Sequence, residues 1–277
     1  MEQPVRFVPV DKQFKKVDRL KGWSFRILLA TTVLTPLLTL LDNHAAHPWV
    51  AHWYPFWKYV LVAVNCCLIV GFGVLEFVAS YQMSNADRDR RLDFLDNAFG
   101  TRYSGQTSIG YFTNEALEPG IYKCLVNCFE NSSHSRTIAG MMLPKQLLVS
   151  LVVLVVFALS AAMGQREIVR LFFELPLPLV LAQDYIRLLI FSKRLDRNHE
   201  NMKWLFNDMR GQAFNDTRVA AAMRDILDYE AIIAWASIKL ETALFDKHWN
   251  QLAANWDELK RMYDVRSVQA VMPEAST

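Results

Sequence analysis

Four long apolar stretches constrain this chain of 277 residues more than any other feature. They cover residues 23–41, 59–81, 147–164 and 168–191. Because a helix rises about 1.5 Å per residue, about 20 apolar residues cross the hydrocarbon core of a bilayer. Each stretch approaches that length. We therefore expect an all-α membrane protein with four transmembrane helices in two pairs.

Polar segments flank and separate the two pairs. We expect a basic N-terminus over 1–22, a first transmembrane hairpin over 23–81, and a polar segment over 82–145. A second hairpin over 146–191, a helical region over 192–264 and a flexible tail over 265–277 complete the chain. The two long polar segments are large enough to form one helical domain together. Within them, the pattern predicts a helix break at 131–133 and one long amphipathic helix over 217–245.

Lysine and arginine residues lie mainly on one side of the expected spans. Six occur in the first 21 residues and seven in 82–145, whereas the opposite side has only Lys58, Arg166 and Arg170. The positive-inside rule therefore predicts that both termini and the middle segment are cytoplasmic. The first stretch is not a cleavable signal peptide, since Pro36 and Asp42 are followed by aromatic residues rather than a small-residue cleavage site.

Several polar residues and prolines lie inside the expected spans, where an unpaired polar group is costly. Glu174, Pro176 and Pro178 belong to the fourth span, and Asn65 and Glu76 to the second. Prolines remove backbone donors, so the fourth helix is expected to kink or open. We identify these five residues as candidates for lining a pore or gate. Glu76 also lies near enough to the cytoplasmic interface to reach it with its side chain.

The segment 82–145 carries a second set of candidates, which have aromatic rings or amide and carboxyl groups. Such side chains stack against and hydrogen-bond a nucleobase, so they are candidates for sensing a nucleotide signal. A structural cap over the cytoplasmic side is the alternative. The set consists of Tyr103, Tyr111, Asn114, Tyr122, Asn127, Glu130 and Asn131.

Two further expectations concern charge and chemistry. Glu230 lies among apolar neighbours and is expected to meet an arginine of the middle segment, for example Arg102, or else to remain partly exposed. Cys124 and Cys128 lack the second half of a zinc site, so we expect no metal. Catalytic and phosphate-binding motifs are absent, and we expect neither an enzyme nor a cofactor. The sequence has no basic patch interleaved with aromatic residues, so we expect no direct binding of duplex nucleic acid.

The layout of two span pairs, a middle segment and a helical tail resembles the SMODS-associating four-transmembrane effectors of bacterial anti-phage defence. The similarity extends to RRLDFLDNAFGTRYSG, LVNCFENSSHS and RDILDYEAIIAWASIKLE. It implies a pore-forming effector of abortive infection in the bacterial inner membrane. A cyclic nucleotide signal or a defence-system partner protein would switch the effector on through its cytoplasmic domain.

Two other functions fit the same sequence. A small ion-coupled transporter would use Glu174 as a coupling carboxylate, although the two halves share no evident similarity. A non-conducting anchor would recruit a cytoplasmic partner through its C-terminal helices. For the pore-forming effector we expect a homo-oligomer embedded in the lipid bilayer, since the small residues of 160–164 allow close helix approach.

Overall fold

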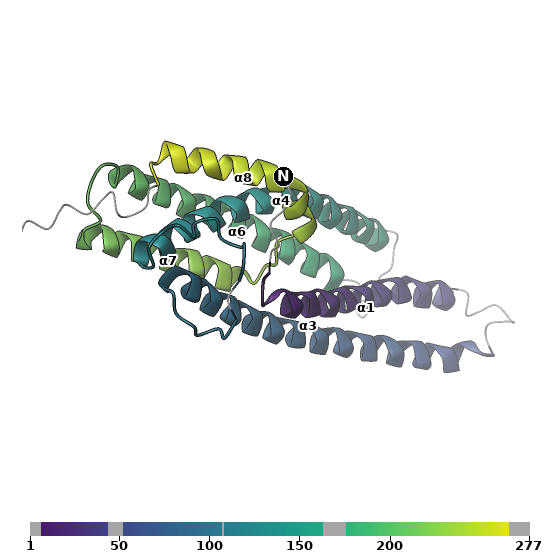
Figure 1. Cartoon of the computed structure of the whole chain (residues 1–277). Helices are drawn as coiled ribbons and strands as arrows, with labels where there is room; N and C mark the ends of the chain where they lie inside the picture. The colour runs from purple at the N-terminus through teal and green to yellow at the C-terminus, as the bar shows by residue number, and fades with distance from the viewer. Residues whose placement is uncertain (1–6, 44–51, 107, 163–175, 266–277) are drawn as a thin grey trace, which may run out of the picture. The chain divides into compact units, whose positions relative to one another are not determined.

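The computed structural model describes residues 7–43, 52–106, 108–162 and 176–265. All regular structure in these ranges is helical, apart from one β-bridge between Phe7 and Ile109. Figure 1 shows the helices, which are α1 (Asp11–Asn43), α3 (Tyr54–Phe99), α4 (Ile121–Ala162), α6 (Pro176–Asp208), α7 (Asp216–Ala236) and α8 (Thr242–Met262). The expected all-α fold is therefore confirmed for this part of the chain.

The chain divides into two compact units. The apolar unit comprises Gln13–Met83 and Lys145–Ile186, and the packed unit comprises Met1–Lys12, Ser84–Pro144 and Arg187–Thr277. Helices α3, α4 and α6 each contribute residues to both units. The packed unit thus joins the middle polar segment to the C-terminal region, while its cytoplasmic location stays a prediction.

The packed unit has an aromatic core centred on Phe129 of α4. The ring of Phe129 stacks on Phe206 of α6 at a centroid distance of 4.8 Å. Trp256 and Tyr263 meet the same ring edge-on at 5.6 and 5.9 Å. Full burial of a large apolar side chain contributes about 1.5–3 kcal/mol. This core therefore holds α4, α6 and α8 together.

Helix α4 continues without interruption through residues 131–133, so the predicted break is wrong. The hydroxyl of Ser132 donates to the carbonyl of Phe129, and Thr137 donates to the carbonyl of Ser133. Serine and threonine hydroxyls that donate to carbonyls of their own helix are satisfied within it, so they do not require a turn that interrupts the helix. Ser132 and Ser133 are also buried, which favours these bonds over solvation.

The predicted single helix over 217–245 is also wrong, because two helices occupy that range. Helix α7 ends at Ala236 and α8 begins at Thr242. Ser237 adopts a left-handed conformation with φ of 48°, and its N–H donates to the carbonyl of Ile233. Such a cap satisfies a terminal carbonyl of the helix. The apolar period continues across this break, so periodicity alone does not reveal it.

The apolar unit has a small interior to which all four of its helices contribute. Leu28 of α1 and Leu181 of α6 are buried, and Phe72 of α3 and Val153 of α4 pack against them. The hydroxyl of Ser24 in α1 donates to Glu76 of α3 at 2.5 Å. Residues 24 and 28 of α1 thus accompany residues 76 and 72 of α3, which is an antiparallel pairing.

Two helical segments are long and apolar enough to cross a membrane, namely Tyr54–Phe99 and Ile121–Val155, whereas four spans were expected. These two contain the expected second span and the first part of the third. This count concerns only the part of the chain that the structure describes. The structure does not describe the side chains of 35–41 in the first expected span, of 156 and 159–164 in the third, or of 168–177 in the fourth.

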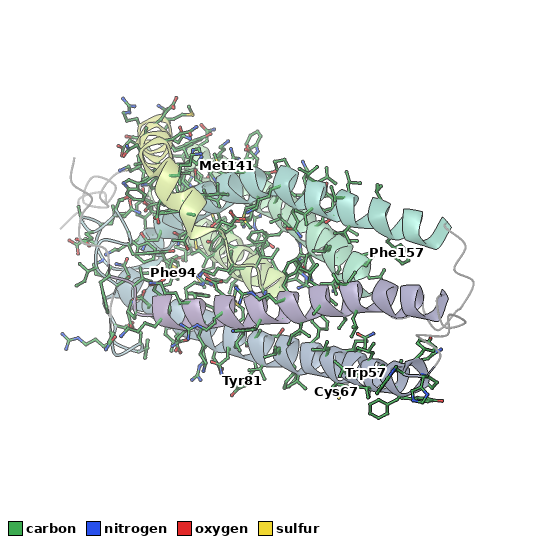
Figure 2. The ribbon with its side chains drawn as sticks, turned by 90° about the vertical axis from the view of Figure 1, so that its right-hand side faces the viewer. Trp57, Cys67, Tyr81, Phe94, Met141 and Phe157 are labelled. Atoms are coloured by element: carbon green, nitrogen blue, oxygen red, sulfur yellow. The ribbon has the colours of Figure 1, made fainter. Side chains whose placement is uncertain are left out.

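Most large apolar side chains of the apolar unit are exposed. Only 6% of the most apolar window of α3 and 11% of that of α4 are buried. Figure 2 shows Trp57, Cys67 and Tyr81 following one another along α3, and all three are exposed. A core helix of a soluble protein would bury such a window. Exposed apolar surface on this scale marks an interaction with a membrane or with another protein.

Candidate functional site

The candidate pore residues have different environments. Glu76 is partly buried and accepts the hydrogen bond from Ser24, and Asn65 is 1% exposed. Pro178 is buried within the first turn of α6, where the missing N–H of a proline costs little. Pro176 is the first residue of α6, but its side chain is not described. Glu174 lies outside the described residues.

Three of the candidate sensing residues meet in one buried polar network. The amide nitrogen of Asn114 donates to Asn127 at 3.0 Å and to Glu130 at 2.7 Å. The side chain of Asn127 in turn donates to Asn97 of α3 at 2.8 Å. Thr113 donates to the other oxygen of Glu130 at 2.8 Å. The network therefore ties the segment after α3 to both α3 and α4.

The same network reaches the C-terminal helix. The indole N–H of Trp256 in α8 donates to the hydroxyl oxygen of Thr113 at 3.0 Å. Asn114, Asn127, Glu130 and Trp256 are each at most 5% exposed, whereas Thr113 is exposed. A ligand approaching from solvent would thus meet Thr113 first. The buried polar groups already bond one another. In this conformation they therefore connect four segments of the packed unit and are not free to bind a ligand.

Burial also changes the proton affinity of Glu130. Desolvation raises the pKa of Glu130 to about 6, although the hydrogen bonds from Thr113 and Asn114 and the charge of Lys260 lower it. A carboxyl group with such a pKa changes its protonation between mildly acidic and neutral pH. The network therefore changes its charge at higher pH than a network built on an ordinary glutamate would.

The other four candidates lie elsewhere in the packed unit. Tyr103 is 70% exposed, and Asn131 is half-buried. Tyr111 meets Phe112 edge-on at 4.7 Å. Tyr122 packs edge-on against Phe206 and Phe214. The structure thus brings Asn114, Asn127 and Glu130 together without the tyrosines.

Glu230 meets an arginine of the middle segment, but that arginine is Arg90 and not Arg102. Both guanidinium NH groups of Arg90 donate to the Glu230 carboxylate, with distances of 2.7 and 3.3 Å. Asp87 lies one turn before Arg90 at 3.6 Å. Arg102 is exposed and follows the end of α3, which Gly100 closes with φ of 68°. Arg102 thus lies beyond the helix that carries Arg90, and the expected pairing of Glu230 with Arg102 is wrong.

Sequence reasoning missed several residues that complete these contacts. Asn97, Thr113 and Trp256 join the polar network, although their separations in sequence carry no signal of proximity. Asp96 accepts hydrogen bonds from Thr101, Tyr103 and Ser104, at 2.6–2.7 Å. Burial raises the pKa of Asp96, but these hydrogen bonds outweigh it and lower the pKa to about 2. The sequence signal for this loop is a carboxylate that shortly precedes a segment of glycines and polar residues.

A buried serine–histidine contact was also missed. The hydroxyl of Ser132 lies 2.8 Å from Nδ1 of His199, and both residues are at most 1% exposed. The His199 ring stacks on Phe129 at 4.8 Å. Burial, together with the charges of Arg136 and Lys203, lowers the pKa of His199 to about 3, so its ring is neutral at physiological pH. Enclosed in the core, the contact has no access for a substrate.

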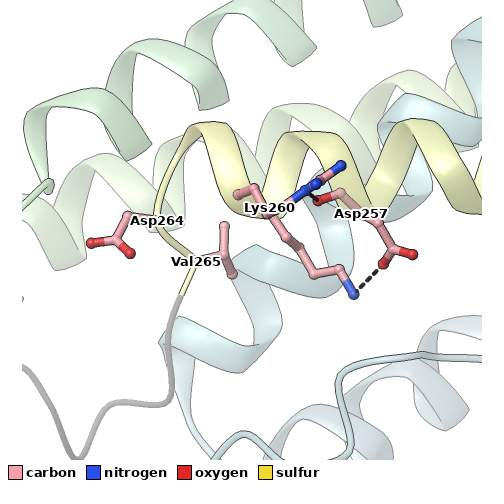
Figure 3. Close-up of a pocket in the computed structure, with 5 residues that line it drawn as sticks. Asp257, Lys260, Asp264 and Val265 are labelled. Carbon is pink, nitrogen blue, oxygen red and sulfur yellow. Dashed lines mark hydrogen bonds and ion pairs between the residues drawn. The ribbon is translucent and has the colours of Figure 1, made fainter.

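The surface of the packed unit has a shallow hollow at the end of α8. Figure 3 shows four of its lining residues labelled, Asp257, Lys260, Asp264 and Val265. Lys260 pairs with Asp257 at 2.8 Å. The charges at this place already neutralise each other, and the hollow is open to solvent. It offers little to hold a ligand.

No group of three or more His, Cys, Asp or Glu residues suited to a metal ion occurs within the described ranges. Cys124 and Cys128 are buried in α4, while Cys66 and Cys67 are exposed on α3. Burial, followed by the neighbouring Cys124, raises the pKa of the Cys128 thiol. A raised pKa disfavours the thiolate, which is the nucleophilic and metal-binding form.

Comparison with models of known protein families finds no match to this chain. Curated proteins and solved structures also yield no match.

Proposed function

We propose that this protein is a four-span membrane effector whose packed unit controls permeabilisation of the bilayer by the apolar unit. The observation that carries the proposal is that only 6% of the most apolar window of α3 and 11% of that of α4 are buried. Lipid tails or further copies of the chain would cover that surface. The defence role rests on the sequence resemblance to four-transmembrane effectors.

The positions of aromatic residues support a membrane location for α3. Trp53, Trp57 and Tyr59 are 51–77% exposed near its beginning, and Tyr81 is 60% exposed further along. From Tyr59 to Tyr81 the helix rises about 33 Å, which is close to the thickness of the hydrocarbon core. Tryptophan and tyrosine favour both membrane interfaces. Exposed apolar residues such as Val70 and Val74 lie between them.

Contacts inside the apolar unit support two hairpins and four spans. Ser24 of α1 bonds Glu76 of α3, and Ser150 of α4 donates to the carbonyl of Leu181 in α6. With spans of opposite direction in each pair, both termini and the middle segment lie on the same side. The positive-inside rule favours the cytoplasm for that side, so the protein would be a multi-pass protein of the bacterial inner membrane.

Continuity of the helices supports control by the packed unit. Helices α3, α4 and α6 each supply residues to the packed core and to the apolar unit without a break in the helix. A nucleotide signal or a partner protein that rearranges the packed core would therefore act directly on spans. Oligomerisation of the apolar units would then assemble a pathway, with Glu76, Asn65 and Glu174 as candidates to line it.

The proposal is tested by recording membrane potential with a voltage-sensitive dye in bacteria that express the chain, with and without phage. The variants are Glu76→Gln and Glu174→Gln, and the matched control is Glu118→Gln, which removes an exposed carboxylate of the packed unit. Membrane levels of all four proteins are equalised.

We expect depolarisation with wild type and with Glu118→Gln, and an altered response with at least one of the span variants. If wild type never changes the potential during infection, the permeabilising function is rejected. The non-conducting anchor would then be the function to pursue.

A further inference from the structure

Helix α1 has one buried face and one exposed, charged face over the residues just before its expected span and at the start of that span. Val17, Ser24, Leu28 and Thr31 are each at most 2% exposed and repeat at intervals of seven, four and three residues. They form the side of α1 that faces the interior of the apolar unit. All charged residues between them are exposed on the surface of the helix.

A stripe of cations lies on the opposite side. At about 100° per residue, Lys15, Lys16, Arg19, Trp23 and Arg26 all fall within about 100° of one another around the helix. All five are exposed, and the guanidinium of Arg26 lies 5.1 Å from the centre of the Trp23 ring. We define these five residues as the α1 cationic stripe. Over its length of about 17 Å the stripe holds four cations, and the exposed Asp18 lies beside it, about 60° from Lys15 around the helix.

The stripe crosses the beginning of the expected span. Trp23 is the first residue of the span, and tryptophan favours the headgroup level of a bilayer. Arg26 is one turn further in, where its long side chain reaches back toward the headgroups over the Trp23 ring. Arg19 lies about 6 Å outward of Trp23, and the two lysines precede it by one turn. The cations therefore occupy the depth of lipid phosphates and the layer next to them.

We propose that the α1 cationic stripe is a binding surface for anionic phospholipid headgroups. Arginine forks and lysine ammonium groups bind phosphate, and each cation near a membrane surface favours anionic lipid. Charge complementarity thus selects anionic over zwitterionic lipid beside α1. This proposal rests on the membrane location proposed above.

The test measures lipid selectivity of the full-length protein reconstituted in phosphatidylcholine vesicles. Trace spin-labelled phosphatidylglycerol or phosphatidylcholine is added, and electron paramagnetic resonance gives the motionally restricted fraction of each label. The variant is Lys16→Gln/Arg19→Gln/Arg26→Gln. The control, Arg210→Gln/Lys247→Gln/Arg261→Gln, removes three exposed cations of the packed unit.

We expect wild type and the control variant to prefer phosphatidylglycerol by about fivefold or more, since a single cation at the surface supplies about that factor. The stripe variant should lose most of this preference. The preference of wild type should also fall in about 1 M salt, where screening shortens the electrostatic range to about 3 Å.

Two results would overturn the stripe as the binding surface. One is a wild-type preference no greater than that of the stripe variant, and the other is an equal loss in the control variant. A failure of the membrane location looks different, because neither label would then show a restricted fraction with any of the proteins.

Discussion

Arg90 and Glu230 are 140 residues apart in sequence and form a bidentate ion pair, with a shortest N–O distance of 2.7 Å. Their side chains are 19% and 16% exposed. The pair joins α3 to α7 inside the packed unit. A charge left in such a place without its main partner is only weakly stabilised by water, because most of the side chain is buried.

Replacing Arg90 with methionine should lower the free energy of unfolding of the packed unit by about 3 kcal/mol, because Glu230 then keeps an uncompensated charge. The double variant Arg90→Met/Glu230→Met should recover most of that loss. Urea unfolding of the full chain in detergent, followed by tryptophan fluorescence, measures both. The matched control is Arg88→Met, an exposed arginine of the same helix. Equal effects of Arg88→Met and Arg90→Met would contradict the role of the pair.

Glu130 should make the fold less stable as pH rises from about 4.5 to about 6. Burial raises its pKa to about 6 from an ordinary value of 4.5, so the folded state holds the proton more tightly than the unfolded chain. A difference of about 1.5 pH units corresponds to about 2 kcal/mol. The variant Glu130→Gln cannot titrate, so its stability relative to wild type should rise by about that amount between pH 4 and pH 7.

Urea unfolding at a series of pH values gives this difference directly. Glu118→Gln serves as control, since Glu118 is exposed. Parallel pH curves for wild type and Glu130→Gln would show that the network does not perturb this carboxyl group.

His199 should act in the opposite direction. Its pKa is lowered to about 3 by burial and by nearby Arg136 and Lys203, while an unfolded histidine titrates near 6.5. The unfolded chain therefore binds the proton first, and stability falls as pH drops below about 6.5. At pH 5 the loss should be about 2 kcal/mol. His199→Phe should remove this part of the acid sensitivity, whereas His248→Phe on α8 should leave it; an unchanged acid sensitivity in His199→Phe would refute the assignment.

The antiparallel pairing of α1 and α3 should be visible by chemical cross-linking. In a background without native cysteines, Ser24→Cys/Glu76→Cys should be bridged rapidly by a short bismaleimide, since the native side chains touch. Arg26→Cys/Tyr59→Cys is the control, because both positions are exposed and this register places them about 22 Å apart along the helices. Peptide mapping identifies the bridged product. Cross-linking of the control as fast as the first pair would argue against this register.

Local chemistry in the sequence determined the class of fold and several helix ends. The apolar stretches predicted helices where α1, α3, α4 and α6 lie. Gly100, which follows α3 with φ of 68°, is a residue type that commonly ends helices, because glycine readily adopts positive φ. Amphipathic periodicity also indicated a helix where α7 lies, although it did not show where α7 ends. Each of these signals lies within one continuous segment of the chain, so it can be recognised without knowing which distant segments come into contact.

Tertiary packing decided the remaining features. Ser132 stays helical because its hydroxyl bonds the Phe129 carbonyl in a buried core, and Ser237 ends α7 although apolar spacing continues past it. Arg90 rather than Arg102 meets Glu230, and Asn114, Asn127 and Glu130 gain Thr113 and Trp256 as neighbours. Partners more than a hundred residues apart are selected by which helix faces pack together. A single sequence carries no direct signal of that choice, whereas burial makes each selected polar contact strong.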